Sequence, residues 1–358
     1  MRLLEFAIPT WHRPEKLSIS VCSIAEQGGH VVISHHLCDL ETMAVVEKLK
    51  KKYPKLVRAV ACELGTSPDY SESFKQLFSL PEAKYTWTFG DDDVLVPGAI
   101  EAITPILERD EFDFIHCAEV VRSASTGSLI KGKLIELCNA IGWIDMTGFI
   151  SCNIIRTTKL NEACQLKSWP LYATNAFVQS CALLEVLYDS ECAFLDTPLV
   201  DSKVQYDEEA TSTRWSESNV GLRYHYVDDA LLDMKKRGII KTNLTPKFFR
   251  YIEYHLWDRF IGHIVNSYNS DQDFQLTDYL DNLLVRCYNL VTFLDPMNRK
   301  RYADEITEVR QSMIEHSGAL QYAIKKAGVM GRLVDNHSRS HYEYGYLRKT
   351  PAKQSPRG

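Results

Sequence analysis

Three consecutive aspartates follow an apolar run in the first third of the chain. Asp91, Asp92 and Asp93 come after the segment YTWTF and one glycine. Because like charges a few ångströms apart repel, three adjacent carboxylates are costly to hold together without a cation. Hard ions such as Mg²⁺ and Mn²⁺ take oxygen ligands, commonly one or two carboxylates together with substrate phosphates. The cluster therefore indicates a divalent-metal and phosphate site, with a solvated acidic turn or a helix N-cap run as the alternative.

The spacing of the three aspartates predicts which of them meet a ligand. At the end of a strand, successive side chains alternate between the two faces of the sheet. Asp91 and Asp93 would then point to one side, and Asp92 to the other. We therefore expect Asp91 and Asp93 to be the pair that faces a ligand.

The elements around this cluster follow the pattern of an α/β fold. Apolar runs alternate with helical periodicity, which is typical of a mostly parallel sheet flanked by helices. We expect strands over residues 3–8, 31–34, 57–62 and 85–89, with helices over 14–27, 40–52 and 70–80 between them. Ligands of such open sheets lie beyond the carboxyl ends of the strands. The aspartates follow the last of these strands, so they lie at the edge where a ligand is expected.

The rest of the chain is predicted to hold fewer strands and more helices. We expect a helix over residues 98–109, an extended segment over 112–119, a helix over about 175–188 and a polar, mobile loop over 200–219. From residue 223 to about 327, apolar and aromatic residues recur at helical spacing. The end of the chain is basic and weakly periodic. The predicted units are an α/β domain over 1–222, an α-helical C-terminal region over 223–330 and a flexible basic tail over 331–358.

Composition excludes several classes of protein. A net charge of −6 over 358 residues gives no overall attraction to nucleic acid, so we expect no nucleic-acid partner. No apolar run reaches the roughly 18 to 20 residues that span a bilayer, and the first residues lack the pattern of a signal peptide. Ten cysteines are scattered without a C-x-x-C pair, which is typical of reduced thiols. We expect a cytoplasmic protein whose tail either contacts the inner face of the membrane peripherally or is plain disorder.

The chain resembles family 2 glycosyltransferases of the GT-A fold, especially the abequosyltransferase-like group of polysaccharide-assembly enzymes. Three segments carry the resemblance in this order: AIPTWHRPEKL, VVISHHLCDLET and YTWTFGDDDVLVPGAIEAI. It covers about residues 4–200 and is most specific over the first hundred. The resemblance implies a Rossmann-like GT-A domain that uses Mn²⁺ or Mg²⁺ to move a sugar from a nucleotide-sugar donor. The implied acceptor is a hydroxyl of a glycan or of a lipid-linked glycan.

The same resemblance implies roles for individual residues. Pro9, Thr10 and Arg13 would contact the nucleotide. Asp91 would bind the ribose, Asp93 would bind the metal with Asp91 beside it, and Asp92 would complete the donor-binding turn.

The second strand departs from the family pattern. Family members usually have an aspartate directly after a serine at its end, near the base and ribose. Here His35 and His36 follow the serine, and only Asp39 keeps the later acidic position. Recognition of the base is therefore left open.

The catalytic base also departs from the family pattern. An inverting transferase needs a carboxylate near the acceptor hydroxyl, because a proton must leave as the sugar is attacked. Family members commonly supply it at the start of a helix, where this chain has Asn175, whose amide cannot accept that proton. Asp145 and Glu185 are the other candidates. The remaining alternatives are a shifted alignment, a retaining mechanism or an impaired enzyme.

Two residues in or after the polar loop are further candidates. Arg214 could neutralise the departing diphosphate, although a solvated loop arginine fits equally well. His225 stands where GT-A enzymes often offer an additional metal ligand, with simple packing as the alternative.

Two other functions compete with sugar transfer. A nucleotidyltransferase of the same fold would usually have a glycine-rich loop after the first strand, and AIPTWHRPEK contains no glycine. A non-catalytic carbohydrate-binding or scaffold protein would keep the fold and lack the base, as Asn175 allows.

Overall fold

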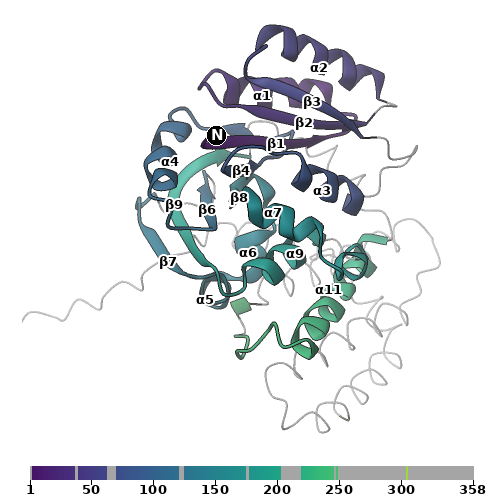
Figure 1. Cartoon of the computed structure of the whole chain (residues 1–358), viewed down its shortest axis with the longest axis vertical. Helices are drawn as coiled ribbons and strands as arrows, with labels where there is room; N and C mark the ends of the chain where they lie inside the picture. The colour runs from purple at the N-terminus through teal and green to yellow at the C-terminus, as the bar shows by residue number, and fades with distance from the viewer. Residues whose placement is uncertain are drawn as a thin grey trace, which may run out of the picture.

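The first half of the sheet is built from alternating strands and helices, as the apolar runs predict. The computed structural model describes residues 2–36, 39–62, 70–120, 125–174, 177–202, 219–245, 247–248 and 304 (Figure 1). The first elements are β1 (Leu4–Thr10), α1 (Pro14–Ala25), β2 (Val31–His36), α2 (Leu40–Lys52), β3 (Val57–Cys62), α3 (Tyr70–Ser79) and β4 (Tyr85–Thr88). Their strands are parallel, in the order β3-β2-β1-β4. Each helix therefore crosses over to return the chain to the same edge of the sheet.

The second half of the same sheet is mixed. Its elements are β5 (Val94–Leu95), α4 (Ala99–Glu108), β6 (Phe114–Glu119), β7 (Leu129–Lys133), α5 (Leu134–Ile141), α6 (Trp143–Thr147), the 3₁₀ helix η1 (Ile150–Cys152), β8 (Asn153–Arg156), α7 (Thr157–Cys164), α8 (Trp169–Tyr172), α9 (Val178–Leu187), β9 (Glu191–Asp201) and α11 (Asn219–Lys236). Strand β8 is antiparallel to β4 and β6, whereas β9 runs parallel to β6 and antiparallel to β5 and β7. The fold class is thus the predicted α/β class, with antiparallel pairs that were not predicted.

The long strand β9 closes this half of the sheet. It curves past β6 toward β7 in Figure 1, and its last residues pair with β5. Its register against β6 shifts on both sides of Ala118, which is where the strand bends. Because β9 ends at Asp201, the predicted loop over 200–219 was placed two residues too early at its start. The residues between 203 and 218 lie outside the described part of the chain.

Helices cover both faces of the sheet, and two hydrophobic clusters fill the space beneath them. Strand β1 divides its side chains between the clusters: Phe6 and Ile8 join the one under α1, α2 and α4, and Ala7 joins the one under α3 and α5–α9. This alternation is the period of two that a strand imposes. Helix α9 is buried along most of its length, including the polar residues Gln179 and Ser180 near its start. Both faces of the sheet are therefore covered, and all four residues of β4 are buried, the threonines Thr86 and Thr88 included.

Helix α11 packs against α8 and α9 in the larger cluster (Figure 1). The Arg237 guanidinium, just after α11, donates to Glu185 Oε1 at 2.6 Å and to the Tyr172 hydroxyl at 2.8 Å. The Tyr172 hydroxyl in turn donates to Glu185. Helix α11 begins at Asn219, before the predicted boundary at residue 223. The division into 1–222, 223–330 and 331–358 stays a prediction, because most of the last two units lies outside the described residues.

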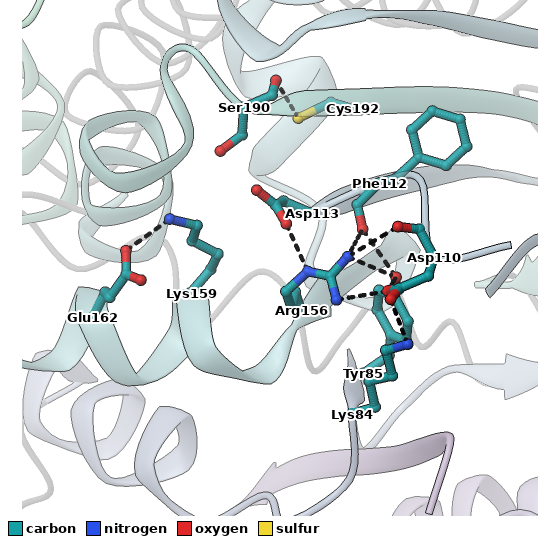
Figure 2. A network of polar contacts seen from close by, with 10 residues as sticks. All are labelled: Lys84, Tyr85, Asp110, Phe112, Asp113, Arg156, Lys159, Glu162, Ser190 and Cys192. Carbon is teal, nitrogen blue, oxygen red and sulfur yellow. Dashed lines mark hydrogen bonds and ion pairs between the residues drawn. The ribbon is translucent and has the colours of Figure 1, made fainter. Parts of the chain in front are cut away.

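A polar network fastens the amino end of β4 (Figure 2). Arg156 donates to Asp113 Oδ1 at 2.6 Å and to Asp110 Oδ1 at 2.7 Å, and it reaches the Tyr85 hydroxyl at 3.1 Å. Lys84 pairs with Asp110 at 2.7 Å. Burial and the hydrogen bond to Asp110 raise the pKa of Tyr85 to about 12, so its hydroxyl stays protonated. The network joins β4, β6 and β8 at the end of β4 that lies away from the aspartates.

Among the described helices, none combines the length and the apolar character needed to cross a bilayer.

Candidate functional site

The three aspartates lie in a turn between β4 and β5. The predicted strand over 85–89 ends at Thr88, so the aspartates do not continue it, and the expected alternation of a strand does not apply. Helix α4 starts only at Ala99, which removes the alternative of an N-cap run. Asp91 and Asp93 are nevertheless the buried pair, 6% and 5% exposed, and the Asp92 side chain is 37% exposed. Burial in the turn thus sets Asp91 and Asp93 apart from Asp92, and the expectation that this pair faces a ligand stays a prediction.

Gly90 allows the turn to fold this tightly. A Cβ atom at this position would lie 2.7 Å from Asp93 Oδ2 and 3.1 Å from Asp92 Oδ1. Any other residue would push these carboxylates away. The Gly90 carbonyl accepts a hydrogen bond from Ser20 Oγ of α1 at 3.0 Å, which ties the turn to the first helix.

Strand β1 supplies the partners of the first two aspartates. Thr10, at the end of β1, donates from its hydroxyl to Asp91 Oδ2 at 2.8 Å. Arg13 follows three residues later and donates from one Nη1 nitrogen to Asp91 Oδ1 at 3.1 Å and to Asp92 Oδ2 at 2.7 Å. Since β1 and β4 are parallel neighbours, their carboxyl ends meet at one edge of the sheet. Of the residues predicted to contact the donor, the structure brings together Thr10, Arg13, Asp91 and Asp92.

Asp93 has a different environment from its two neighbours. Its Oδ2 accepts a hydrogen bond from Ser151 Oγ of η1, a neutral partner. Within the described part of the chain, no group donates to its Oδ1. Burial raises the pKa of Asp93 to about 8, and the charges of Asp92, Glu119 and Asp91 contribute to the rise. Among the described residues, no cation is paired with this carboxyl group, whereas Arg13 is paired with both of its neighbours.

Asp91 is less perturbed because a cation is at hand. Burial raises its pKa to about 6, while the charge of Arg13 and the hydrogen bonds from Thr10 and Arg13 oppose the rise. The difference between Asp91 and Asp93 follows from their partners, since both side chains are almost equally buried.

The residues of the turn fit a hard divalent cation. The atoms that could bind a metal here are all carboxylate oxygens. The three aspartates carry more acidic groups than the single positive charge of Arg13 can balance. No cluster of three or more His, Cys, Asp or Glu side chains poised to hold a metal is present in the described ranges. Mg²⁺ and its analogues are usually held by one or two carboxylates with substrate phosphates, so Asp93 with Asp91 beside it would suffice once a diphosphate is bound.

The end of β2 lies at the same edge of the sheet as the aspartate turn. Asp39 caps α2 by accepting from Thr42 N at 3.1 Å, and its other oxygen accepts from His12 N at 2.5 Å. Burial alone would raise the pKa of Asp39, but these hydrogen bonds lower it overall, so the carboxylate stays ionised. His35 is buried at the end of β2 beside Thr10, and its Nδ1 has no hydrogen-bond partner among the described residues. A buried nitrogen of this kind is a group that a ligand could satisfy.

Two candidates for the catalytic base, Glu185 and Asp145, lie on the helices α9 and α6. Glu185 is paired with Arg237 and also accepts from Ser168 at 2.6 Å. Burial would raise its pKa, but the hydrogen bonds from Arg237, Ser168 and Tyr172 lower it overall, so these contacts account for Glu185 as part of the helix packing. Asp145 is buried on α6. The contacts of Glu185 favour a structural role for it, and the role predicted for Asp145 stays a prediction.

Three further candidates fall outside what the structure describes. Asn175 and Arg214 are not among the described residues, and His225 is described only as part of the backbone of α11. Their predicted roles stay predictions. Pro9 is in β1, one residue before Thr10.

Sequence reasoning missed two residues at this site. Glu119 ends β6, is buried and accepts from Ser202 Oγ at 3.1 Å, and it lies close enough to raise the pKa of Asp93. Its position at the end of the expected segment over 112–119 was a usable signal, since strand ends gather at the site. Ser151 lies in a stretch without clear periodicity, and nothing in the sequence pointed to it.

Comparisons with known proteins bear on the family and on the fold of the chain. Residues 2–149 match the family model described as Glycosyltransferase like family 2. Staphylococcus aureus TarS 1–349 in complex with UDP-GlcNAc is similar, with a TM-score of 0.53 and 13% identity over 95% of this chain and 92% of that chain. The same protein in complex with UDP has a TM-score of 0.50 and 11% identity over 99% of this chain and 98% of that chain.

A more distant likeness is the mannosyltransferase PcManGT from Pyrobaculum calidifontis in complex with GDP-Man and Mn²⁺. It has a TM-score of 0.43 and 10% identity, over 88% of this chain and 86% of that chain. No curated protein sequence matches the chain significantly. The likeness to the abequosyltransferase-like group therefore finds no support beyond the sequence segments themselves.

These findings show the fold of the chain. It has a GT-A-like α/β fold, and the family match covers residues 2–149, which is less than half of its 358 residues. The matched range contains Thr10, Arg13 and the aspartate turn, and it ends two residues before Ser151.

Proposed function

We propose that this chain is a family 2 glycosyltransferase, which the match over residues 2–149 supports, and that it moves a sugar from a nucleotide-diphosphate donor to a hydroxyl of a glycan or lipid-linked glycan with the help of Mn²⁺ or Mg²⁺. The observation that carries the proposal is the contrast within the aspartate turn. Arg13 bridges Asp91 and Asp92 at 3.1 and 2.7 Å, while the buried Asp93 has no cationic partner among the described residues. A site of this kind is suited to a cation that arrives with an anionic ligand.

The chain's own residues would bind and orient the donor. Thr10 and Arg13 hold Asp91 in one orientation, so its outer surface can meet the ribose of the nucleotide. Arg13 can also turn toward a phosphate, since guanidinium groups bind carboxylates and phosphates in the same way. His35 offers, at the end of β2 where the base is expected, an imidazole nitrogen that has no hydrogen-bond partner within the described ranges. These contacts would align the sugar for attack by the acceptor hydroxyl.

Asp93 would hold the metal against the diphosphate. When bound, the metal supplies Lewis-acid stabilisation of the departing diphosphate. The carboxylate of Asp93 would keep its charge in that complex, because a cation close by lowers the pKa that burial raises.

The residue that accepts the acceptor's proton is not assigned. Glu185 has contacts that account for it structurally, Asp145 is buried on α6 without an assigned role, and Asn175 lies outside the described residues. A non-catalytic carbohydrate-binding protein therefore stays the second candidate, because an amide at the base position is what such a protein would have. A nucleotidyltransferase is disfavoured by the loop after β1, which has no glycine.

A peripheral contact with the membrane is also predicted for this protein. A lipid-linked acceptor would place the enzyme at an anionic surface, where each Lys or Arg contributes on the order of 1 kcal/mol. The basic tail over residues 331–358 would supply those side chains and lies outside the described residues.

The proposal can be tested by thermal shift with UDP, GDP, CDP and dTDP sugars, each with and without Mn²⁺. A ligand that binds only the folded state raises the melting temperature by mass action. We expect one class of nucleotide sugar to stabilise the protein in a Mn²⁺-dependent manner, and Asp93→Ala to remove that dependence. Asp189→Ala is the matched control, because Asp189 is a carboxylate whose partners are Lys133 and Lys241.

The outcomes separate the candidate functions. A full Mn²⁺-dependent shift in Asp93→Ala would show that the metal is held elsewhere. Stabilisation by nucleotide sugars without release of the nucleotide, with or without glycan acceptors, would favour the binding protein. Stabilisation by nucleoside triphosphates together with sugar 1-phosphates would favour the nucleotidyltransferase.

A further inference from the structure

Ser151 joins the aspartate turn to the segment before β8. It lies in η1, is fully buried, and contacts both ends of the turn. Its Oγ accepts from Gly90 N at 2.7 Å and donates to Asp93 Oδ2. Its carbonyl oxygen accepts from Trp87 Nε1 of β4 at 2.7 Å. The side chain and the backbone of Ser151 are thus both engaged with β4 and the turn that follows it.

The donors and acceptors around Ser151 fix the direction of its proton. A serine hydroxyl has one proton to donate and lone pairs that accept. Gly90 N–H can only donate, so the Ser151 oxygen must accept from it. The single hydroxyl proton is then directed at Asp93 Oδ2. This arrangement fixes the carboxylate by one oxygen and leaves Oδ1 without a donor in the described part of the chain.

The neutral character of Ser151 separates Asp93 from the other two aspartates. Arg13 pairs with both Asp91 and Asp92 and orients them. Ser151 orients Asp93 without adding positive charge. Among the described residues, no cation is paired with the Asp93 carboxyl group, and a metal that binds there releases any proton that the group carries, since metal ligands must be deprotonated.

We propose that Ser151 is a positioning residue that fixes the Asp93 side chain so that Oδ1 is presented to the metal of the donor complex. The inference rests on the proposed function, because it concerns the metal of the same site. Ser151 does not touch substrate or metal in this proposal and acts only through Asp93.

Ser20 provides a matched control for this role. It is also a fully buried serine that contacts Gly90, and it donates to the Gly90 carbonyl at 3.0 Å. No hydrogen bond joins Ser20 to Asp93 among the described residues. Removing either hydroxyl takes away a buried hydrogen bond to the same turn, but only one of the two changes reaches the carboxylate.

The experiment measures Mn²⁺ affinity in the full chain at a saturating concentration of the nucleoside diphosphate identified by the thermal-shift panel. Free Mn²⁺ is followed by electron paramagnetic resonance, which does not depend on turnover. For Ser151→Ala we expect Mn²⁺ affinity to fall about tenfold to a hundredfold, the usual effect of losing a group that orients a metal ligand. Ser20→Ala should bind Mn²⁺ as the wild type does, even where its melting temperature falls by a similar amount.

A second variant keeps the test valid if Ser151→Ala does not fold. Ser151→Cys retains a weaker donor at the same position and should give an intermediate Mn²⁺ affinity. Unchanged Mn²⁺ affinity in the folded Ser151 variant, or an equal loss in Ser20→Ala, would overturn the positioning role while leaving the proposed function intact. A wild-type protein that binds no Mn²⁺ with any nucleoside diphosphate would overturn both.

Discussion

Replacing Asp93 with asparagine should stabilise the metal-free protein at neutral pH. Burial and the charges of Asp92, Glu119 and Asp91 raise the pKa of Asp93 to about 8 in the folded state, against an ordinary value of 3.8. Between about pH 4 and pH 8 the folded protein therefore holds a proton on Asp93 that the unfolded chain has lost. The stability of the wild type falls as pH rises through this window, because the folded state binds more protons.

The size of the effect follows from the width of the window. One pH unit in which the folded state alone keeps the proton costs about 1.4 kcal/mol of unfolding free energy. The wild type should thus lose on the order of 2 to 3 kcal/mol between pH 5 and pH 7 from this group. The asparagine side chain of the variant cannot ionise, yet its amide oxygen can still accept from Ser151. We expect Asp93→Asn to lack this loss and to melt about 5 °C higher at pH 7.

The assay is urea and thermal unfolding at pH 5, 6, 7 and 8 in the presence of EDTA. The groups that face Asp93 are Asp91 and Asp92 of the same turn, Glu119 of β6 and the neutral Ser151 of η1. Asp189→Asn, an exposed carboxylate beside Lys241, is the control and should show no gain. If wild type and Asp93→Asn lose stability in parallel from pH 5 to pH 8, the burial argument for Asp93 is refuted.

Two further predictions concern the packing around the site. Arg156→Ala should lower the unfolding free energy by about 1 to 3 kcal/mol in urea denaturation, because Asp113 loses its arginine donor and the Phe112 carbonyl keeps only the Tyr85 hydroxyl, and Arg156→Lys should recover only part of it. Arg237→Ala should cost about 2 to 3 kcal/mol by leaving the Glu185 carboxylate unpaired, whereas the double variant with Glu185→Gln should recover part of that loss. Equal stability of the single and double variants would show that the charge of Glu185 is not what the arginine balances.

The parallel half of the fold could be predicted from the sequence because its elements have strong local signals. Helix α2 begins and ends at the predicted residues, 40 and 52, since Asp39 caps its first turn and three lysines end it. Strand β3 also agrees, over residues 57–62. Each of these elements is one apolar run or one amphipathic pattern of ordinary length, so a single period describes it.

The second half could not be predicted because its elements depend on distant partners. Strand β9 contains a proline and acidic residues, and it is a strand only because it pairs with β5, β6 and β7 at once. Strand β8 has four residues, too few to show a period. Ser151 belongs to this half, and its role arises where η1 meets the end of β4 in the folded chain.

The candidate site was predictable only to the level of residue type. Three adjacent carboxylates indicate a cation, but their sequence does not say which of them already has one. In the fold, Arg13 approaches from β1 and serves Asp91 and Asp92, while η1 approaches Asp93 with a hydroxyl. The same residue type therefore has a pKa of about 6 in Asp91 and of about 8 in Asp93. When the environment gives like groups at one site different pKa values, the groups have different roles. Asp91 and Asp92 are held in place by their ion pairs with Arg13, and Asp93 is the carboxyl group left to bind an incoming cation.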